Sequence, residues 1–121
     1  MKLSKTEEEL MSYLWQKEKA FMKDLLDAYP DPKPAPTTIA TLLKRMTDKG
    51  FVSYTLFGKS REYFPLVEKS AYFSKHVNGL IKNFFNDSAS QFASFFTKET
   101  QLSKDELKEL RKIIDKQIKD S

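Results

Sequence analysis

The chain has 121 residues, enough for one ordinary domain or for one small domain with an appendage. It is 40% hydrophobic and 31% charged, and no apolar run approaches the ~18 residues of a membrane-spanning helix. The chain has no cysteine, which excludes disulfides, thiolate metal sites and cysteine nucleophiles. The first ten residues turn acidic before any apolar stretch develops, so we expect no signal peptide and a cytoplasmic location.

The formal net charge of +4 is concentrated in one segment. Residues 36–61 contain five basic residues and one acidic residue, so this segment alone carries a charge of +4. A local positive patch is the usual electrostatic signature of a partner with a phosphate backbone. An ordinary solvated charged face explains a patch of this size equally well, so charge alone does not decide.

The N-terminal segment is predicted to form two helices. Ser4 and Glu7 have the spacing of a capping box, and an apolar helix face follows at Leu10, Met11, Leu14 and Trp15. A second, shorter helix is predicted over 21–28. Residues 29–36 then contain four prolines, so we expect an extended or turning segment there.

A third helix and a hairpin are predicted next. The helix spans 36–49, with Pro36 at its first position and Gly50 as its stop. Its inward face is predicted to contain Ile39, Leu42, Leu43 and Met46. Two strand-like runs, 51–57 and 61–66, are joined by Gly58-Lys59-Ser60 and read as a two-stranded hairpin. This order predicts a mainly α fold with a small β-hairpin wing: a winged helix-turn-helix domain over 1–68.

The second half is predicted to be a helical dimerisation domain over 69–121. We expect a helix over 69–86, a break at 86–88, a short helix from Ala89 past Phe96, and a final helix opened by a capping box at Ser103 and Glu106. Five of the ten phenylalanines lie between residues 84 and 96, and such an appendage has little core of its own. A symmetric dimer supplies a partner surface most simply; folding back on the first domain is the alternative. The predicted interface residues are Phe73, Val77, Leu80, Phe84, Phe92, Phe96, Leu107, Leu110 and Ile114.

The residue inventory does not favour an enzyme. His76 is the only histidine, and an ordinary surface or interface histidine is its simpler interpretation. The chain has three glycines and no phosphate-cradling loop, and it lacks the usual spacings of metal ligands. We therefore predict no catalytic residues, no metal and no cofactor.

The helix over 36–49 has the side chains expected of DNA recognition. In a helix-turn-helix, the start of the second helix of the motif enters the major groove. Threonine hydroxyls there can bond base edges or phosphates, and basic residues farther along and in the wing suit the DNA backbone. The predicted DNA-binding residues are Thr37, Thr38, Thr41, Lys44, Arg45, Lys49, Lys59 and Arg61. Hydroxyl residues are also common at helix starts without any function, and Tyr54 and Tyr63 are expected mainly to pack between the strands.

Four segments resemble one family in order and spacing. They are "LSKTEEELMSYLW", "TTIATLLKRMTDKGFVSY", "REYFPLVEKSAYF" and "LSKDELKELRKII", and together they span nearly the whole chain. They resemble the penicillinase repressor family, also known as the BlaI/MecI family. The resemblance implies a dimeric winged-helix repressor of a pseudo-palindromic operator, often upstream of β-lactam-resistance genes. It also implies release when a membrane sensor protease triggers cleavage in the dimerisation domain.

The chain departs from the family pattern at three places. Ala35 stands where a serine usually caps the recognition helix, and Ala40 stands where a basic residue often follows the Thr-Ile pair. Base preference is therefore expected to differ from that of the well-known members. The family's cleaved Asn-Phe bond has its nearest match at Ser94–Phe95, without the asparagine.

These observations predict a homodimeric transcriptional repressor that binds double-stranded DNA through the helix 36–49 and the wing 51–66. The alternative is a winged-helix adaptor that docks a protein partner without specific DNA binding. Architectural DNA binding without an operator lies between the two.

Overall fold

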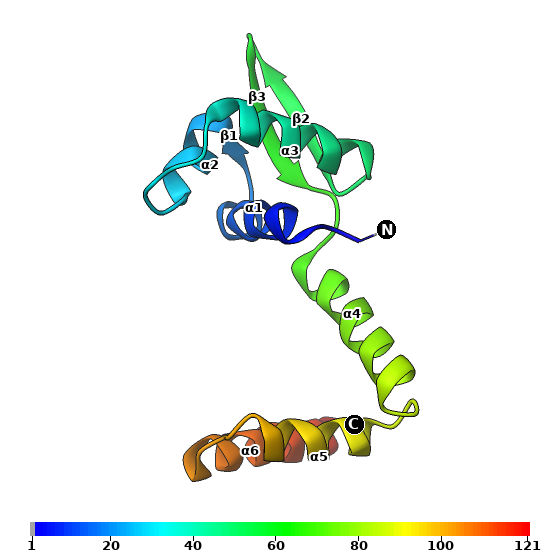
Figure 1. Ribbon diagram of the computed structural model, residues 1–121. Coiled ribbons are helices and arrows are strands. Elements are labelled where there is room, and N and C mark those ends of the chain that lie inside the picture. Colours follow the sequence, from blue (N-terminus) through cyan, green and yellow to red (C-terminus); the bar gives the residue numbers. More distant parts are fainter. Residues whose placement is uncertain (1) are drawn as a thin grey trace. The chain divides into compact units, whose positions relative to one another are not determined.

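The computed structural model describes residues 2–121 (Figure 1). In chain order the elements are α1 (Lys5–Lys17), β1 (Ala20–Phe21), α2 (Met22–Ala28), α3 (Pro36–Asp48), β2 (Val52–Phe57), β3 (Ser60–Pro65), α4 (Lys69–Phe84), α5 (Ala89–Glu99) and α6 (Lys104–Asp120). The chain divides into two compact units, one ending at Phe73 and the other covering Ser74–Ser121. The predicted fold class, mainly helical with a small antiparallel wing and C-terminal helices, is confirmed.

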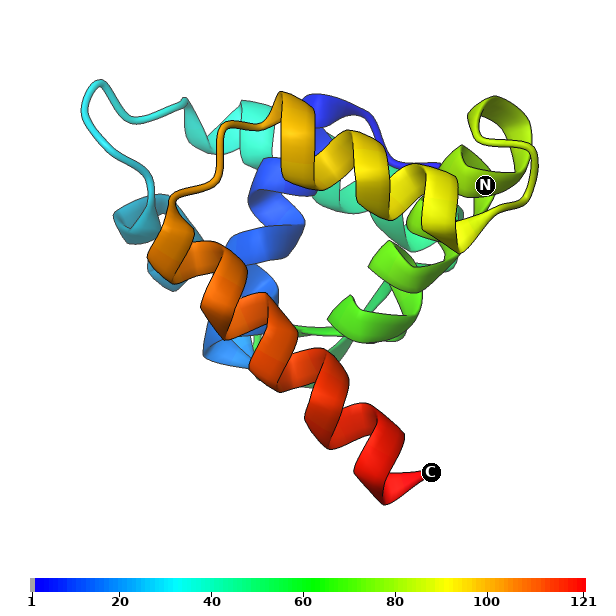
Figure 2. The ribbon, with the colours of Figure 1, turned by 90° about the horizontal axis from the view of Figure 1, so that it is seen from below.

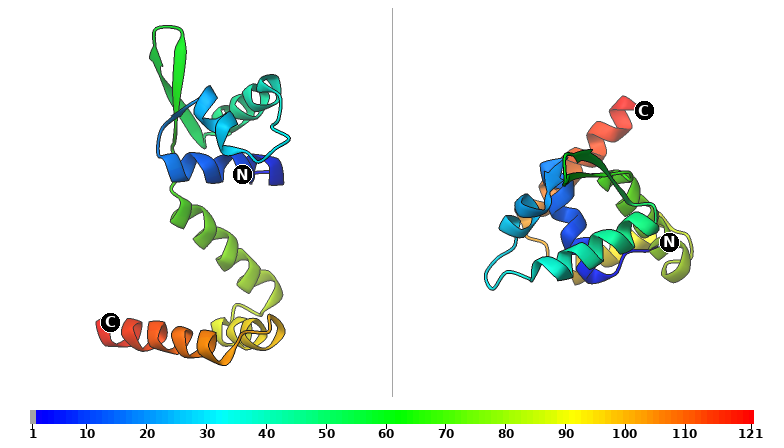
Figure 3. Two further views of the ribbon diagram at one scale, coloured as in Figure 1. Left: turned by 90° about the vertical axis from the view of Figure 1, so that its left-hand side faces the viewer. Right: turned by 90° about the horizontal axis from the view of Figure 1, so that it is seen from above.

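The wing belongs to a three-stranded antiparallel sheet in the order β1-β3-β2. β2 and β3 form the predicted hairpin, which projects beyond the helices of the first unit (Figure 3). The third strand was not predicted: Ala20 pairs with Tyr63 and Phe21 with Glu62. The prediction that Phe21 starts a helix was therefore wrong, because its backbone is extended and α2 begins one residue later, at Met22.

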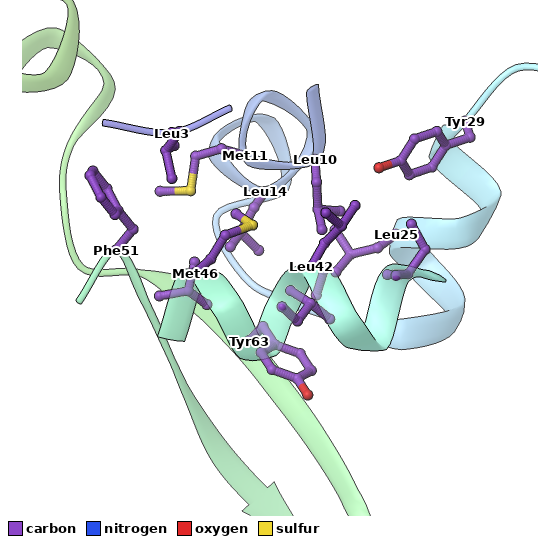
Figure 4. Packing of buried hydrophobic residues seen from close by; sticks show 14 of the residues in the cluster. Leu3, Leu10, Met11, Leu14, Leu25, Tyr29, Leu42, Met46, Phe51 and Tyr63 are labelled. Atoms are coloured by element: carbon purple, nitrogen blue, oxygen red, sulfur yellow. The ribbon is translucent and has the colours of Figure 1, made fainter. Parts of the chain in front are cut away.

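The core of the first unit joins the three N-terminal helices to the base of the sheet (Figure 4). α1 and α3 contribute the apolar faces predicted for them, except that Trp15 is only half-buried, and α2 buries Leu25. The buried residues include Leu10, Met11, Leu14, Leu25, Ile39, Leu42, Leu43, Met46, Val52 and Tyr63. Full burial of aliphatic side chains contributes about 1.5–3 kcal/mol each, so this cluster holds α3 firmly against α1 and α2.

The ends of α1 and α3 are defined by local hydrogen bonds. The Ser4 hydroxyl accepts from the Glu7 N–H at 3.3 Å, and Glu7 Oε1 accepts from the Ser4 N–H at 2.8 Å, which confirms the capping box. At the end of α3, Gly50 has φ = +82°, a conformation that glycine adopts without a Cβ penalty. The Phe51 N–H donates to the Met46 carbonyl at 2.9 Å and the Gly50 N–H to the Thr47 carbonyl at 3.0 Å. This Schellman ending turns the chain directly from α3 into β2.

The second unit has little internal core. None of residues 74–121 is buried, although α5 and α6 are regular helices joined by a short bend (Figure 2). The α6 capping box is formed, with the Ser103 hydroxyl accepting from the Glu106 N–H at 3.1 Å. Across residues 2–121, no helix is both long enough and apolar enough to cross a membrane.

Candidate nucleic-acid interface

The outward face of α3 is formed by small and basic side chains. Pro36 and Ala35 start the helix without any side-chain cap, and Thr37, Thr38 and Thr41 of the first two turns are exposed. The Thr41 hydroxyl donates to the Thr37 carbonyl at 2.9 Å. This hydroxyl can therefore serve a ligand as an acceptor. Within residues 2–121, neither the Thr37 nor the Thr38 hydroxyl makes such a bond.

The cations of α3 fall into two classes. Arg45 is exposed, and Lys44 is exposed and forms an i,i+4 ion pair with Asp48 at 3.3 Å. The Lys49 ammonium instead points inward: it donates to Glu7 Oε1 at 2.7 Å and to the Lys2 carbonyl at 3.3 Å. Sequence reasoning grouped Lys49 with the DNA-facing cations, but the structure gives it a partner on α1.

Glu7 is the buried side of this ion pair, with only 1% of its surface exposed. Burial alone would raise the pKa of the Glu7 carboxyl. Hydrogen bonds from Lys49 and from the backbone and hydroxyl of Ser4 outweigh that effect and leave the pKa below its ordinary value. The pair therefore ties the end of α3 to the start of α1 and fixes the orientation of α3.

The wing places its arginine on an aromatic ring. The Arg61 guanidinium lies over the Tyr54 ring, with Cζ 4.4 Å from the centroid, and Tyr54 and Tyr63 are opposite each other across β2 and β3. The neighbouring Tyr63 hydroxyl raises the pKa of Arg61 further, so the guanidinium is charged at any physiological pH. Lys59 lies at the exposed turn beside Gly58, whose φ is +62°.

Two exposed apolar residues near the wing tip were missed by sequence reasoning. Leu56 and Phe57 are 61% and 55% exposed, and the Phe57 ring meets the Phe21 ring edge-on at 6.0 Å. The alternation of side chains along the strand indicates that Leu56 shares a face of the sheet with Tyr54. It does not indicate that Leu56 lies too far along the hairpin to contact the core.

The predicted dimer residues lie on exposed apolar faces. Along α4, Phe73, Val77, Leu80 and Phe84 recur on one side and are 43%, 41%, 42% and 76% exposed. Along α6, Leu107 and Ile114 are 40% and 57% exposed, while Leu110 is half-buried. Phe92 and Phe96 of α5 stack at 6.2 Å, and Phe92 is half-buried while Phe96 is 37% exposed.

The candidate cleavage bond, Ser94–Phe95, lies inside α5, and both residues are exposed. A protease needs an extended segment, so cleavage at this bond would require local opening of the helix.

No grouping of three or more histidine, aspartate or glutamate side chains over residues 2–121 could hold a metal ion. The exposed side chains of α3 and the wing supply cationic, hydroxyl and aromatic groups.

Comparison with known proteins places this architecture in a family. The model of the penicillinase repressor family matches residues 3–116. The methicillin resistance regulatory protein MecI of Staphylococcus aureus (strain N315) is 30% identical over 115 residues, covering 94% of each chain. MecI of Mammaliicoccus sciuri matches to the same extent, and the penicillinase repressor of Bacillus licheniformis is 25% identical over 114 residues, 93% of this chain and 89% of that protein. The chain therefore belongs to the penicillinase repressor (BlaI/MecI) family of transcriptional repressors, which are not enzymes.

Proposed function

We propose that this repressor acts as a homodimer that binds a pseudo-palindromic DNA operator, with one α3 and one wing reading each half-site. The observation that carries the proposal is the outward face of α3, where exposed threonines precede exposed basic residues beside a cationic wing. A helix of this kind inserts its small N-terminal residues into the major groove, and flanking cations neutralise phosphates.

The proposed DNA-contacting set is Thr37, Thr38, Thr41, Lys44, Arg45, Lys59 and Arg61. Lys49 is left out of this set, because its ammonium is held between Glu7 and the Lys2 carbonyl. Its proposed role is to hold the recognition helix in place.

The proposed dimer interface is built from the second unit. A segment of 48 residues without a single buried side chain has no core that would hold it folded alone. The apolar faces of α4 and α6 supply the surface for a second copy, and a two-fold dimer matches a two-fold operator.

The names of the relatives suggest which genes this chain regulates and which signal releases it from DNA. They are named for penicillinase and for methicillin resistance, so we propose that this chain regulates genes of β-lactam resistance. A membrane sensor protease would then act on it indirectly, with Ser94–Phe95 as the candidate bond. Because the proposed target is operator DNA, we propose a cytoplasmic location for the protein.

A titration of purified protein against a random-sequence duplex tests DNA binding directly. The dissociation constant is followed by fluorescence anisotropy between about 50 and 200 mM salt. We expect the dissociation constant to rise steeply with salt, as it does when a protein makes several phosphate contacts. A dissociation constant that does not change with salt would overturn the proposal and support the adaptor function. The exposed Leu56 and Phe57 near the wing tip would then be the docking surface for a protein partner.

A further inference from the structure

A groove lies between the recognition helix and the wing in the first unit. It encloses about 490 Å³ and is lined by Ala40, Lys44, Thr47, Asp48, Tyr54, Arg61 and Tyr63. The four helix residues have spacings of four, seven and eight, so they share one side of α3. Ala40 has no atom beyond Cβ, which keeps that end of the groove open.

The wing wall of this groove is a ladder on one face of the sheet. Tyr54 is opposite Tyr63 and Leu56 is opposite Arg61 in the β2–β3 register, so these side chains lie on the same face. The two tyrosine rings are 5.6 Å apart, and Arg61 lies diagonally across the strands on the Tyr54 ring at 4.4 Å. Tyr63 is buried in the core, which anchors the ladder.

Arg61 is thereby held in place before any ligand arrives. Its guanidinium lies over the Tyr54 ring, and this contact holds the side chain along the sheet. An arginine side chain without a packing partner loses conformational entropy when it binds a ligand. Arg61 has already lost part of that entropy in the unbound protein, so its binding costs less. Lys59, two residues away, has no such platform among the described contacts.

The charges that face the groove favour an anion. Lys44 and Arg61 contribute two cations from opposite walls, and Asp48 contributes one carboxylate that pairs with Lys44 at 3.3 Å. The Thr47 hydroxyl is already committed, because it donates to the Leu43 carbonyl at 2.7 Å. One wall of the protein groove is α3, the helix expected in the DNA major groove. The anion closest to this wall would therefore be the sugar-phosphate backbone at the edge of the major groove.

We propose that this groove seats one backbone phosphate of the DNA duplex, with Arg61 as its main ligand, Lys44 as the second, and Tyr54 as the positioning residue for Arg61. The inference rests on the proposed DNA binding and adds a defined contact to it. Asp48 competes with the phosphate for Lys44, so it limits the affinity.

The test compares variants of Arg61 and Tyr54 in the full-length protein, by anisotropy on one duplex at several salt concentrations. Arg61→Met removes a phosphate ligand and should lower the salt slope by about one. Arg61→Lys keeps the charge but loses the planar stack, so the slope should stay and the affinity should fall about two- to five-fold. Tyr54→Leu should match Arg61→Lys, and Tyr54→Phe, which keeps the ring, should restore wild-type binding.

Lys59→Met is the matched control, because it removes a wing cation that lies on no ring. Its loss of affinity should be smaller than that of Arg61→Met. Thermal unfolding of every variant shows whether the wing is intact, and Tyr54→Phe separates loss of the platform from loss of the fold.

Three outcomes are decisive. The pattern above supports the phosphate seat. Wild-type affinity in both Arg61→Lys and Tyr54→Leu, with Arg61→Met no worse than Lys59→Met, would overturn it while leaving the repressor function intact. Failure of the wild-type protein to bind duplex at any salt concentration would overturn the seat together with the proposed function.

Discussion

Single residues on the outward face of α3 are expected to divide into those that hold the DNA backbone and those that read bases. Arg45→Ala removes an exposed cation, so it should weaken binding to all sequences about equally and lower the salt slope by about one. Thr38→Ala removes a hydroxyl and a methyl at the helix start and should instead change the preference among sequences. Competition binding with a panel of duplexes measures both. If both variants merely unfold, this helix face is wrongly assigned to DNA.

The lysines of α3 are expected to separate by partner. Lys49→Met leaves the buried Glu7 carboxylate without its cation and should cost about 1–3 kcal/mol of stability. Lys44→Met breaks only an exposed pair, so it should change stability little and should lower the salt slope of DNA binding. Urea unfolding and DNA titration of the two variants give the comparison. Equal stability of both variants would contradict the internal role of Lys49.

The Glu7–Lys49 pair also predicts a pH dependence. The folded-state pKa of Glu7 lies below its ordinary value of 4.5, so the stabilisation is complete above that value and is lost as the pH falls through the folded-state pKa. The difference in unfolding free energy between wild type and Glu7→Gln should therefore stay constant from neutral pH to about pH 5 and shrink below it. A difference that grows on acidification would contradict the sign of the shift.

At this scale the sequence predicted exposure well and partners poorly. Helical periodicity put Thr37, Thr38, Thr41, Lys44 and Arg45 on the side of α3 away from the core, and all five are exposed. The partner of Lys49 is 42 residues away in the chain, and the platform of Arg61 depends on the strand register. Neither follows from local spacing, since tertiary packing sets both.

Among the elements, the junction between α3 and the wing is the most constrained. Gly50→Ala should destabilise the first unit by about 1–2 kcal/mol, because φ = +82° is costly for a residue with a Cβ. Steric clash does not contribute, since a Cβ at this position would have no neighbouring atom within 4 Å. Gly50→Asn is the matched control and should cost less, since asparagine tolerates this region. Thermal unfolding of both variants measures the difference. Equal losses would mean that side-chain bulk, and not backbone conformation, decides.

Most elements could be predicted because their signals are local. Capping boxes marked the starts of α1 and α6, and Pro36 and Gly50 bounded α3. β1 could not be predicted, because two residues are too few to alternate and their partners, Tyr63 and Glu62, lie about forty positions onward. The apolar Phe21 was therefore assigned to the helix that follows it.

At the scale of the whole molecule, the exposed faces of α4 and α6 are expected to be covered by a second copy. Ile114→Asp places a charge on the apolar face of α6 and should shift the protein to monomer and weaken operator binding strongly. Gln117→Asp adds the same charge at an exposed polar position of the same helix and should leave the dimer intact. Sedimentation velocity measures whether each variant is a monomer or a dimer. A wild-type monomer at micromolar concentration would contradict the interface.

Selection from a pool of random duplexes tests whether a dimer of this chain reads an inverted repeat. The purified full-length protein is used at near-physiological salt, and bound duplexes are sequenced. We expect enrichment of an inverted repeat whose half-sites are separated by about one helical turn, or about 10 base pairs. Binding without enrichment of any sequence, or no binding at all, would contradict it.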